Sequence, residues 1–196
     1  MSRLPPLTRD DCNDEQRVLW DRITESRGRQ GLEMTDASGS LMGPFHAMAL
    51  RPKAGEHMAA LGGVLRFRSA APDNLLEVAI CTVGAHWTSE FEFWAHRRMA
   101  VDAGVDEAAL DAIAAGDTPS FADTAERLVY EWAHSLVTSG HPTQDQYDAL
   151  VAAVGIDAVI DLTLTCGYYC QVSFLLNAFD VQLPEGVQPT WGGRSS

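Results

Sequence analysis

Apolar residues recur three and four positions apart along most of this chain, which is the spacing of one face of an α-helix. The apolar stretches end at glycine, proline or short polar segments, and these are typical helix stops. No stretch alternates apolar and polar residues in the way that a half-buried strand does. The pattern therefore predicts an all-α protein of about eight helices.

The stretch 74–87 is apolar nearly all round, which predicts a helix buried at the centre of a bundle. A second long apolar helix is expected over 156–179. The pattern of residues 75–80 returns at 159–164, and each copy is followed by a small residue and aromatics. Two interpretations are open: a duplicated helical unit, or coincidence between two apolar helices.

The length of 196 residues fits one domain. We expect a Pro-rich N-terminal arm over 1–12, a first helical unit over about 44–116 and a second over about 120–180. The segment 28–43 is rich in Gly, Ser, Thr and Asp, and it is expected to be a long loop that could act as a lid.

The composition and net charge of the chain argue against some classes of binding partner. Hydrophobic residues make up 46% of the chain, which is typical of a globular protein, and the formal net charge is −13. Nucleic acid and anionic membranes both require a basic face, so neither is an expected partner. The start of the chain lacks a signal-peptide pattern, and no uninterrupted run of about 18 apolar residues predicts a membrane span. The four cysteines form no disulfide framework, so a reduced, cytoplasmic location is expected.

The densest candidate chemistry lies between residues 77 and 96. Ser89, Glu92 and His96 are spaced i, i+3, i+7, so on a helix they share one face. His96 can exchange a proton at neutral pH, and Glu92 one turn away can orient it. Glu77 is a carboxylate within an apolar run, so it must find a partner or be protonated. These groups, with aromatic residues around them, indicate a small-molecule site.

Blander interpretations stand beside this one. Glu92 and His96 could be an exposed helical pair while Glu77 reaches solvent. A metal ion could be held by Glu92, His96 and His86, but no paired-His zinc motif is present and no metal is expected. Two cysteines, at 166 and 170, lie on one face of an apolar helix and are expected to pack rather than react.

Several segments resemble the carboxymuconolactone decarboxylase family, within the alkyl hydroperoxidase D-like superfamily. The resemblance is carried by Leu-Leu-Glu-Val-Ala-Ile, Ser-Glu-Phe-Glu-Phe-Trp-Ala-His and Ala-Val-Asp-Ala-Gly-Val, in this order. Weaker matches lie at 3–7, 43–45, 167–169 and 183–184, so the resemblance extends over roughly residues 3–184.

The resemblance implies an all-α fold built as a helical duplication and assembled into homo-oligomers, as a dimer, trimer or hexamer. The peroxidase branch has a Glu, then Cys-x-x-Cys, then a His four residues on. Here that Glu falls on Glu77 and that His on His96, while Ser89 and Glu92 occupy the cysteine positions. Disulfide-cycling peroxidase chemistry cannot run without both thiols. The decarboxylase branch, which has a Glu four residues before its His, resembles the chain better.

The leading hypothesis is a lyase (decarboxylase) or isomerase that needs no cofactor and acts on a small lactone or carboxylate compound. His96 would be the general acid/base, Glu92 its partner and Glu77 a buried relay carboxylate. The expected substrate-binding residues are Ser89, Trp87, Phe93, Arg97 and Tyr169. Two alternatives are a thiol-based, peroxiredoxin-like antioxidant protein using Cys81, Cys166 or Cys170, and a non-catalytic oligomeric ligand-binding protein.

Overall fold

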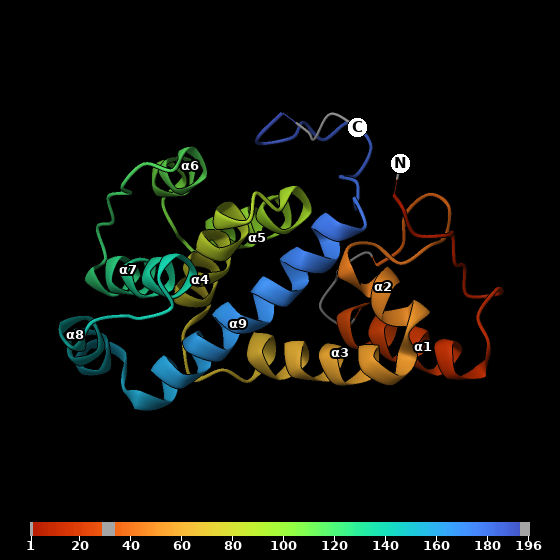
Figure 1. The fold of residues 1–196 in the computed structure, drawn as a ribbon, viewed down its shortest axis with the longest axis horizontal. Coiled ribbons are helices and arrows are strands. Elements are labelled where there is room, and N and C mark those ends of the chain that lie inside the picture. The colour runs from red at the N-terminus through yellow and green to blue at the C-terminus, as the bar shows by residue number, and fades with distance from the viewer. Residues whose placement is uncertain (1, 29–33, 193–196) are drawn as a thin grey trace.

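The computed structural model describes residues 2–28 and 34–192, and within these ranges it contains nine helices and no named strand. Two isolated bridges, Thr8 with Ser40 and Thr35 with Leu41, are the extended pairings among the described residues. Figure 1 shows the arrangement. The helices are α1 (Asp14–Gly28), α2 (Pro44–Leu50), α3 (Pro52–Phe67), α4 (Asp73–His86), α5 (Glu90–Asp102), α6 (Glu107–Ala115), α7 (Thr124–Thr138), α8 (Gln144–Val154) and α9 (Ile156–Ala178).

Helix α4 is the centre of the bundle. Every residue from Leu75 to Gly84 is buried, because α5, α7 and α9 all pack around this helix. The all-round apolar pattern therefore has the physical cause expected for it: between Leu75 and Gly84 no face of the helix meets water. This placement also takes Glu77 into the interior, where its side chain is 0% exposed.

A second, smaller hydrophobic cluster joins the N-terminal elements. Leu19, Trp20 and Ile23 of α1 pack with Leu41 from the loop and Met48 of α2. Helix α3 lies between this cluster and the main core, because Met58 packs against both. The molecule thus has two apolar clusters, and the boundary between them positions the cavity described below.

The two copies of the apolar sequence pattern fall on α4 and on α9, which pack directly against each other. After the first copy the chain breaks and restarts as α5, whereas α9 continues as one helix of 23 residues. By length and hydropathy α9 is the one described helix that could cross a membrane, but half of the apolar window is buried inside the fold. A core helix of a globular protein gives the same signal.

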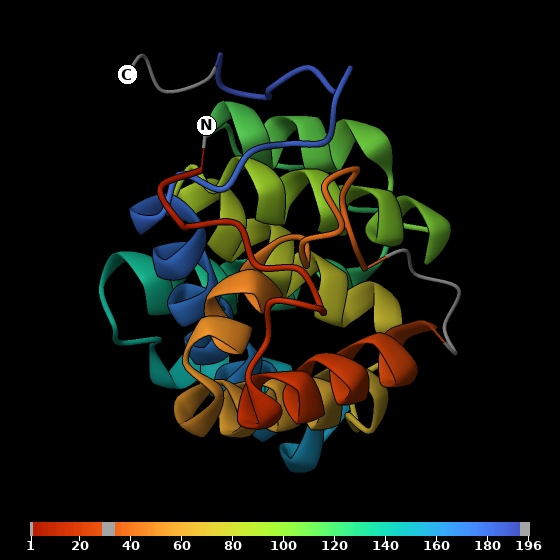
Figure 2. The same ribbon diagram turned by 90° about the vertical axis from the view of Figure 1, so that its right-hand side faces the viewer.

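The N-terminal arm lies beside the C-terminal end of α9. The amide of Arg3 donates a hydrogen bond to the carbonyl of Phe179 at 2.9 Å. Farther along, the ring Nε2 of His46 in α2 lies 2.9 Å from the carbonyl oxygen of Pro5, and Figure 2 shows the arm passing in front of α2. The arm is therefore held against both α9 and α2.

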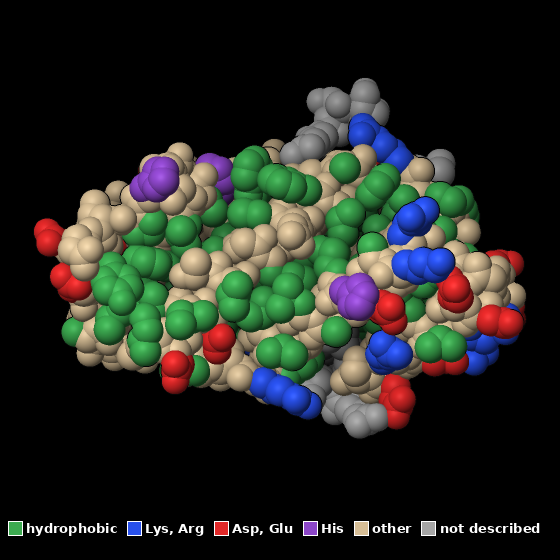
Figure 3. Space-filling view, turned by 60° about the horizontal axis from the view of Figure 1, so that its bottom comes forward, with side chains coloured by type: hydrophobic (Ala, Val, Ile, Leu, Met, Phe, Trp, Pro, Cys, Tyr) green, Lys and Arg blue, Asp and Glu red, His purple; other side chains and the backbone are tan. Residues whose placement is uncertain are grey.

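Apolar side chains are exposed on one face formed by α3 and α9. Leu61 and Val64 of α3 and Ile160 and Leu164 of α9 are between 43% and 50% exposed. Figure 3 shows hydrophobic side chains spread across the face on which these helices lie, with charged groups mainly near its edges. Exposed apolar area of this extent is a recognised mark of an interaction surface.

Candidate active site

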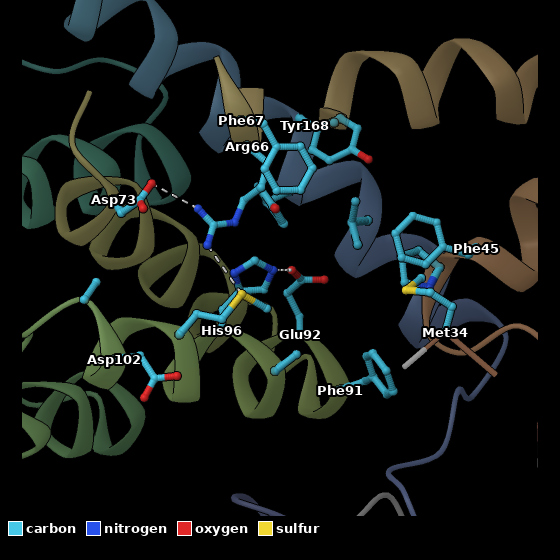
Figure 4. Close-up of a pocket in the computed structure, with 17 residues that line it drawn as sticks. Met34, Phe45, Arg66, Phe67, Asp73, Phe91, Glu92, His96, Asp102 and Tyr168 are labelled. Atoms are coloured by element: carbon cyan, nitrogen blue, oxygen red, sulfur yellow. Dashed lines mark hydrogen bonds and ion pairs between the residues drawn. The ribbon is translucent and has the colours of Figure 1, made fainter. Parts of the chain in front are cut away.

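A cavity of about 410 Å³ lies where the two apolar clusters meet. Helix α3, helix α5 and helix α9 form most of the wall, and the N-terminal elements add its far side (Figure 4). Pockets of this size take small ligands. The lining residues are Met34, Pro44, Phe45, Gly62, Arg66, Phe67, Asp73, Phe91, Glu92, Ala95, His96, Met99, Asp102, Ala103, Tyr168, Tyr169 and Val172.

A chain of hydrogen-bonded ionisable groups ends on the cavity wall. The Nδ1 atom of His96 lies 2.7 Å from Oε2 of Glu77, and its Nε2 atom lies 3.0 Å from Oε1 of Glu92. All three side chains are buried: Glu77 is 0%, Glu92 3% and His96 7% exposed. Both ring nitrogens of His96 are therefore occupied by carboxylates, and the structure brings together the three residues that the sequence selected.

The turn between α4 and α5 creates this convergence. Thr88 adopts a positive φ of 45°, which reverses the chain direction, and α5 then runs back along α4. The start of α5 packs directly against Gly84, where an added Cβ atom would lie at ordinary van der Waals distance, 3.6 Å, from Cγ of Glu92. Glu77 and His96, 19 residues apart in sequence, are thus brought into contact.

Arg66 of α3 completes the group from the opposite side. Its Nη2 atom lies 2.7 Å from Oε1 of Glu77 and its Nη1 atom 3.4 Å from Oδ1 of Asp73. The contact with Glu77 is an ion pair, since no well-aligned hydrogen bond reaches Oε1. Nη2 also donates to Sδ of Met99 at 3.5 Å. The guanidinium therefore balances one of the two buried carboxylates.

The imidazole of His96 is charged at neutral pH in this environment. Burial disfavours the charged ring and lowers the pKa, but the carboxylates of Glu77 and Glu92, by their charge and their hydrogen bonds, outweigh burial and raise the pKa of His96 to about 9. As an imidazolium, His96 donates from both nitrogens. Tyr169 packs edge-on against the ring, with 4.9 Å between ring centroids.

Of the three hydrogen-bonded residues Glu77, His96 and Glu92, it is Glu92 that directs an atom into the cavity. Oε1 accepts from His96, whereas Oε2 has no hydrogen-bond partner among the described residues, and Figure 4 shows it pointing away from the ring into the cavity. The hypothesis from sequence gave the proton-transfer role to His96 and a supporting role to Glu92. The geometry favours the reverse, because His96 has no free ring nitrogen.

Of the five expected substrate-binding residues, one lines the cavity and four do not. Tyr169 lines the cavity. Ser89 is buried at the start of α5 and is not part of the wall, and Phe93 packs against Trp191 in the core. Trp87 packs against Phe174 and donates to Cys170 Sγ.

Arg97 also lies away from the cavity. Its guanidinium contacts Asp111 at 2.7 Å and Glu107 at 3.2 Å on α6. Neighbouring residues on a helix point about 100° apart, so a residue next to His96 does not share its direction. Arg98 is over the ring of Trp94, with 5.4 Å to the centroid, and likewise is not on the wall.

The thiols are poorly placed for redox chemistry. Cys12, Cys81 and Cys166 are buried, and all four cysteines are unpaired. Burial raises the pKa of Cys81 well above its ordinary value and that of Cys166 to about 12. A thiol in this state yields little of the nucleophilic thiolate. No cluster of three or more His, Cys, Asp or Glu side chains suited to a metal ion occurs in 2–28 and 34–192.

Outside the 77–96 stretch, sequence reasoning found Tyr169 but missed the other cavity residues. The sequence analysis did not select Arg66, the positive partner of the buried Glu77. Gly62 allows close packing against Tyr168, because a Cβ atom at Gly62 would collide with its hydroxyl oxygen. Of the expected loop 28–43, residue 28 belongs to α1 and 29–33 lie outside the described residues, but Met34 lines the cavity.

Comparison with solved structures identifies the fold. A peroxidase-related protein from Ralstonia eutropha JMP134 with the alkylhydroperoxidase AhpD core superposes with a TM-score of 0.76 at 16% identity, over 94% of this chain and 93% of that one. A cysteine-to-alanine variant of the debrominase Bmp8, in complex with 2,3,4-tribromopyrrole, gives a TM-score of 0.70 at 16% identity, over 94% of this chain and 95% of the other.

A third neighbour, a protein of unknown function from Agrobacterium tumefaciens described as a candidate AhpD antioxidant defence protein, gives a TM-score of 0.60 at 15% identity, over 70% of this chain and 95% of its own. No protein-family model matches the sequence. No curated protein matches it either. The chain therefore has the all-α, AhpD-like fold that its sequence predicted, and this fold is shared by proteins with different activities.

Proposed function

We propose that this chain is an acid/base enzyme that transfers a proton on a small cyclic carbonyl or lactone compound, as an isomerase or a lyase of the carboxymuconolactone decarboxylase type. The observation that carries the proposal is the buried chain Glu77–His96–Glu92, which ends with a carboxylate oxygen in an aromatic-walled cavity. Buried ionisable groups with perturbed protonation in a cavity are typical of proton-transfer sites.

The chemistry follows from the positions of the groups. Oε2 of Glu92 takes a proton from a carbon next to the substrate carbonyl, and the C–H electron pair moves onto the carbonyl oxygen as an enolate. The nitrogens of His96 and Arg66 are occupied by other protein groups, so these two residues stabilise the enolate by the field of their positive charge and not by a direct contact. The proton returns from Glu92 to a different carbon, so the double bond moves and no electrons are gained or lost. In the lyase version, loss of carbon dioxide generates the enolate and the same site protonates it.

The fold neighbours are compatible with a small planar ligand. The Bmp8 variant holds 2,3,4-tribromopyrrole, a small ring, on the same helical architecture. In this chain the ring would lie among Phe45, Phe91 and Tyr168, beside the free oxygen of Glu92. In the resemblance to the peroxidase branch, Ser89 and Glu92 occupy the positions of the two redox cysteines, which supports proton transfer in place of thiol chemistry.

The test is isomerisation of an uncharged unsaturated lactone, such as α-angelica lactone, followed by proton NMR in deuterated water. The protein should accelerate both double-bond migration and incorporation of deuterium at carbon. Glu92→Gln keeps the size of the side chain but removes the base, so the rate should fall by roughly 100-fold or more.

Glu131→Gln is the matched control, since Glu131 pairs with Arg127 on α7 and does not line the cavity. It should keep the wild-type rate. Equal rates for Glu92→Gln and the wild-type protein, or no acceleration by the wild-type protein, would contradict the proposal.

A thiol-based antioxidant function is the second candidate, supported by the likeness to peroxidase-related folds. Cys81 is close enough to Glu77 and Glu92 for their charges to act on it, but those charges disfavour its thiolate. Peroxide reduction by the wild-type protein that disappears when all cysteines are replaced by alanine would favour this function over proton transfer.

We further propose that copies of this chain assemble through the exposed apolar face of α3 and α9. The support is the row of half-exposed Leu61, Val64, Ile160 and Leu164 on two adjacent helices. A self-complementary patch of this kind suits a two-fold dimer. Light scattering coupled to gel filtration should give more than one copy for the wild-type protein and one copy for Val64→Glu/Leu164→Glu.

A further inference from the structure

The charges around the cavity are unequal. The side chains of Asp73, Glu92 and Asp102 are on its wall, and Glu77 lies directly behind His96. The cationic groups among the described lining residues are Arg66 and His96. With His96 charged, this leaves an excess of negative charge at the site.

Neither cation is available to a substrate anion. Both nitrogens of His96 contact carboxylates, and both terminal nitrogens of Arg66 contact Glu77, Asp73 or Met99. A substrate carboxylate could bind Arg66 only by displacing Glu77, which is fully buried and would be left without its positive partner.

The polar and apolar groups are also separated in space. In Figure 4, Asp73 and Asp102 lie at one end of the cavity, and Met34, Phe45 and Phe91 lie at the other, with Glu92 and His96 between them. Asp73 is bound to Arg66 at 3.4 Å, whereas Asp102 forms no ion pair with any described residue. The acidic end therefore has one carboxylate whose charge is not neutralised nearby.

We propose that this cavity selects a planar ring that is uncharged or positively charged, and excludes rings that carry a carboxylate. The ring would pack at the aromatic end and its polar substituent would face Asp102. Aromatic side chains favour cations over anions at their faces, which adds to the effect of the carboxylates. The inference rests on the same site as the proposed function, and it favours isomerisation over decarboxylation, because a decarboxylase must accept a carboxylate.

The test uses three ligands of the same shape: benzamide is uncharged, benzamidine is a cation and benzoate is an anion at neutral pH. Isothermal titration calorimetry should show that benzoate binds the wild-type protein at least about tenfold more weakly than benzamide, and benzamidine at least as well as benzamide. Benzoate binding equal to that of benzamide, or no binding by any of the three, would overturn the proposal.

Single substitutions test which residues cause the difference in affinity between the three ligands. Asp102→Asn should weaken benzamidine by about three- to tenfold and leave benzamide unchanged, since only the charge is removed. Phe91→Ala should weaken all three ligands, because it removes the apolar wall. Asp117→Asn, an exposed residue beyond the cavity wall, should change none of them. An unchanged affinity for benzamidine in Asp102→Asn would refute the role of that carboxylate.

These measurements need no turnover. If lactone isomerisation fails while the order of the three ligands holds, the proposed function is wrong and the charge selection stands. If the protein isomerises the lactone but does not show the expected order of the three ligands, the acid/base function stands and the proposed selection of uncharged or cationic rings is wrong.

Discussion

Nη2 of Arg66 lies 2.7 Å from Oε1 of Glu77, so the innermost carboxylate of the site is held from two sides, by Arg66 on α3 and by His96 on α5. The contact joins a helix that belongs to the N-terminal part of the chain to the centre of the bundle. A site built this way is coupled to the packing of three helices, and its residues therefore affect stability as well as chemistry.

Removing Arg66 should destabilise the protein. Arg66→Met keeps much of the side-chain volume but leaves the buried charge of Glu77 with one cation fewer. Breaking a buried ion pair from one side costs about 3–5 kcal/mol, and we expect a loss near the lower value because the Arg66 side chain is 18% exposed. Urea unfolding monitored by circular dichroism measures the loss.

Arg127→Met provides the comparison. Arg127 pairs with Glu131 on the surface of α7, where its side chain is 47% exposed. Surface pairs contribute roughly 0–1 kcal/mol, so this variant should unfold near the wild-type urea concentration. A similar decrease in the free energy of unfolding in both variants would mean that the Arg66–Glu77 contact stabilises the protein no more than a surface ion pair does.

Stability should fall between neutral and alkaline pH. The pKa of His96 is raised to about 9 in the folded protein, above its ordinary 6.5, so the folded state binds this proton more tightly. The stabilisation is complete below pH 6.5 and is lost as pH rises through about 9; a pKa difference of this size corresponds to roughly 3 kcal/mol. Denaturant unfolding at intervals from pH 6 to 9.5 measures it.

The variant His96→Gln should lack this loss of stability, because glutamine does not titrate. The three thiols with raised pKa values, Cys12, Cys81 and Cys166, remain in both proteins, so their effect cancels in the difference. A wild-type curve parallel to that of His96→Gln over this range would show that His96 is not held as an imidazolium.

Two adjacent glycines of α3 should respond in opposite ways to alanine. A Cβ atom at Gly62 collides with the hydroxyl of Tyr168, which is only 5% exposed and cannot move freely, so Gly62→Ala should cost about 1–3 kcal/mol. At Gly63 nothing lies within 4 Å of the added atom, so Gly63→Ala should stabilise the helix by about 0.5–1 kcal/mol. Thermal unfolding of the pair tests both signs together.

The native protein should react slowly with Ellman's reagent at most of its cysteines. Cys12, Cys81 and Cys166 are buried and only Cys170 is partly exposed, where its sulfur accepts from Nε1 of Trp87 at 3.3 Å. At pH 8 we expect roughly one thiol to react in minutes and the remainder only after unfolding, since burial blocks access and thiolate formation. Rapid reaction of several thiols would reopen the case for redox chemistry.

The sequence indicated the helical fold and three residues of the site because both depend on local spacing. The apolar run of α4 requires a central position, and the i, i+4 relation of Glu92 and His96 requires one helix face. Glu77 was selected because a carboxylate within such a run needs a partner. These rules act within one or two helices and need no knowledge of the whole fold.

The remaining lining residues depend on contacts between distant helices. Arg66 reaches Glu77 only because α3 packs against α9 and ends beside α4, and nothing in its own helix signals this. Arg97 is a cation that could attract a substrate carboxylate, but its direction is set by Asp111 on α6. Trp87 and Phe93 are aromatic residues beside the site in sequence, but Phe93 packs in the core and Trp87 packs against its edge.

The reversal at Thr88 makes the site sensitive to the number of residues rather than to their identity. A straight helix would separate the backbones of Glu77 and His96 by about 28 Å along its axis. The turn instead brings Oε2 of Glu77 and Nδ1 of His96 within 2.7 Å of each other. One residue inserted just before Glu92 would rotate the rest of α5 by about 100° and carry both Glu92 and His96 off the cavity wall. Substitutions around this turn can be absorbed by repacking, but changes of length cannot, so the spacing between Glu77 and His96 is the quantity that relatives with this chemistry must share.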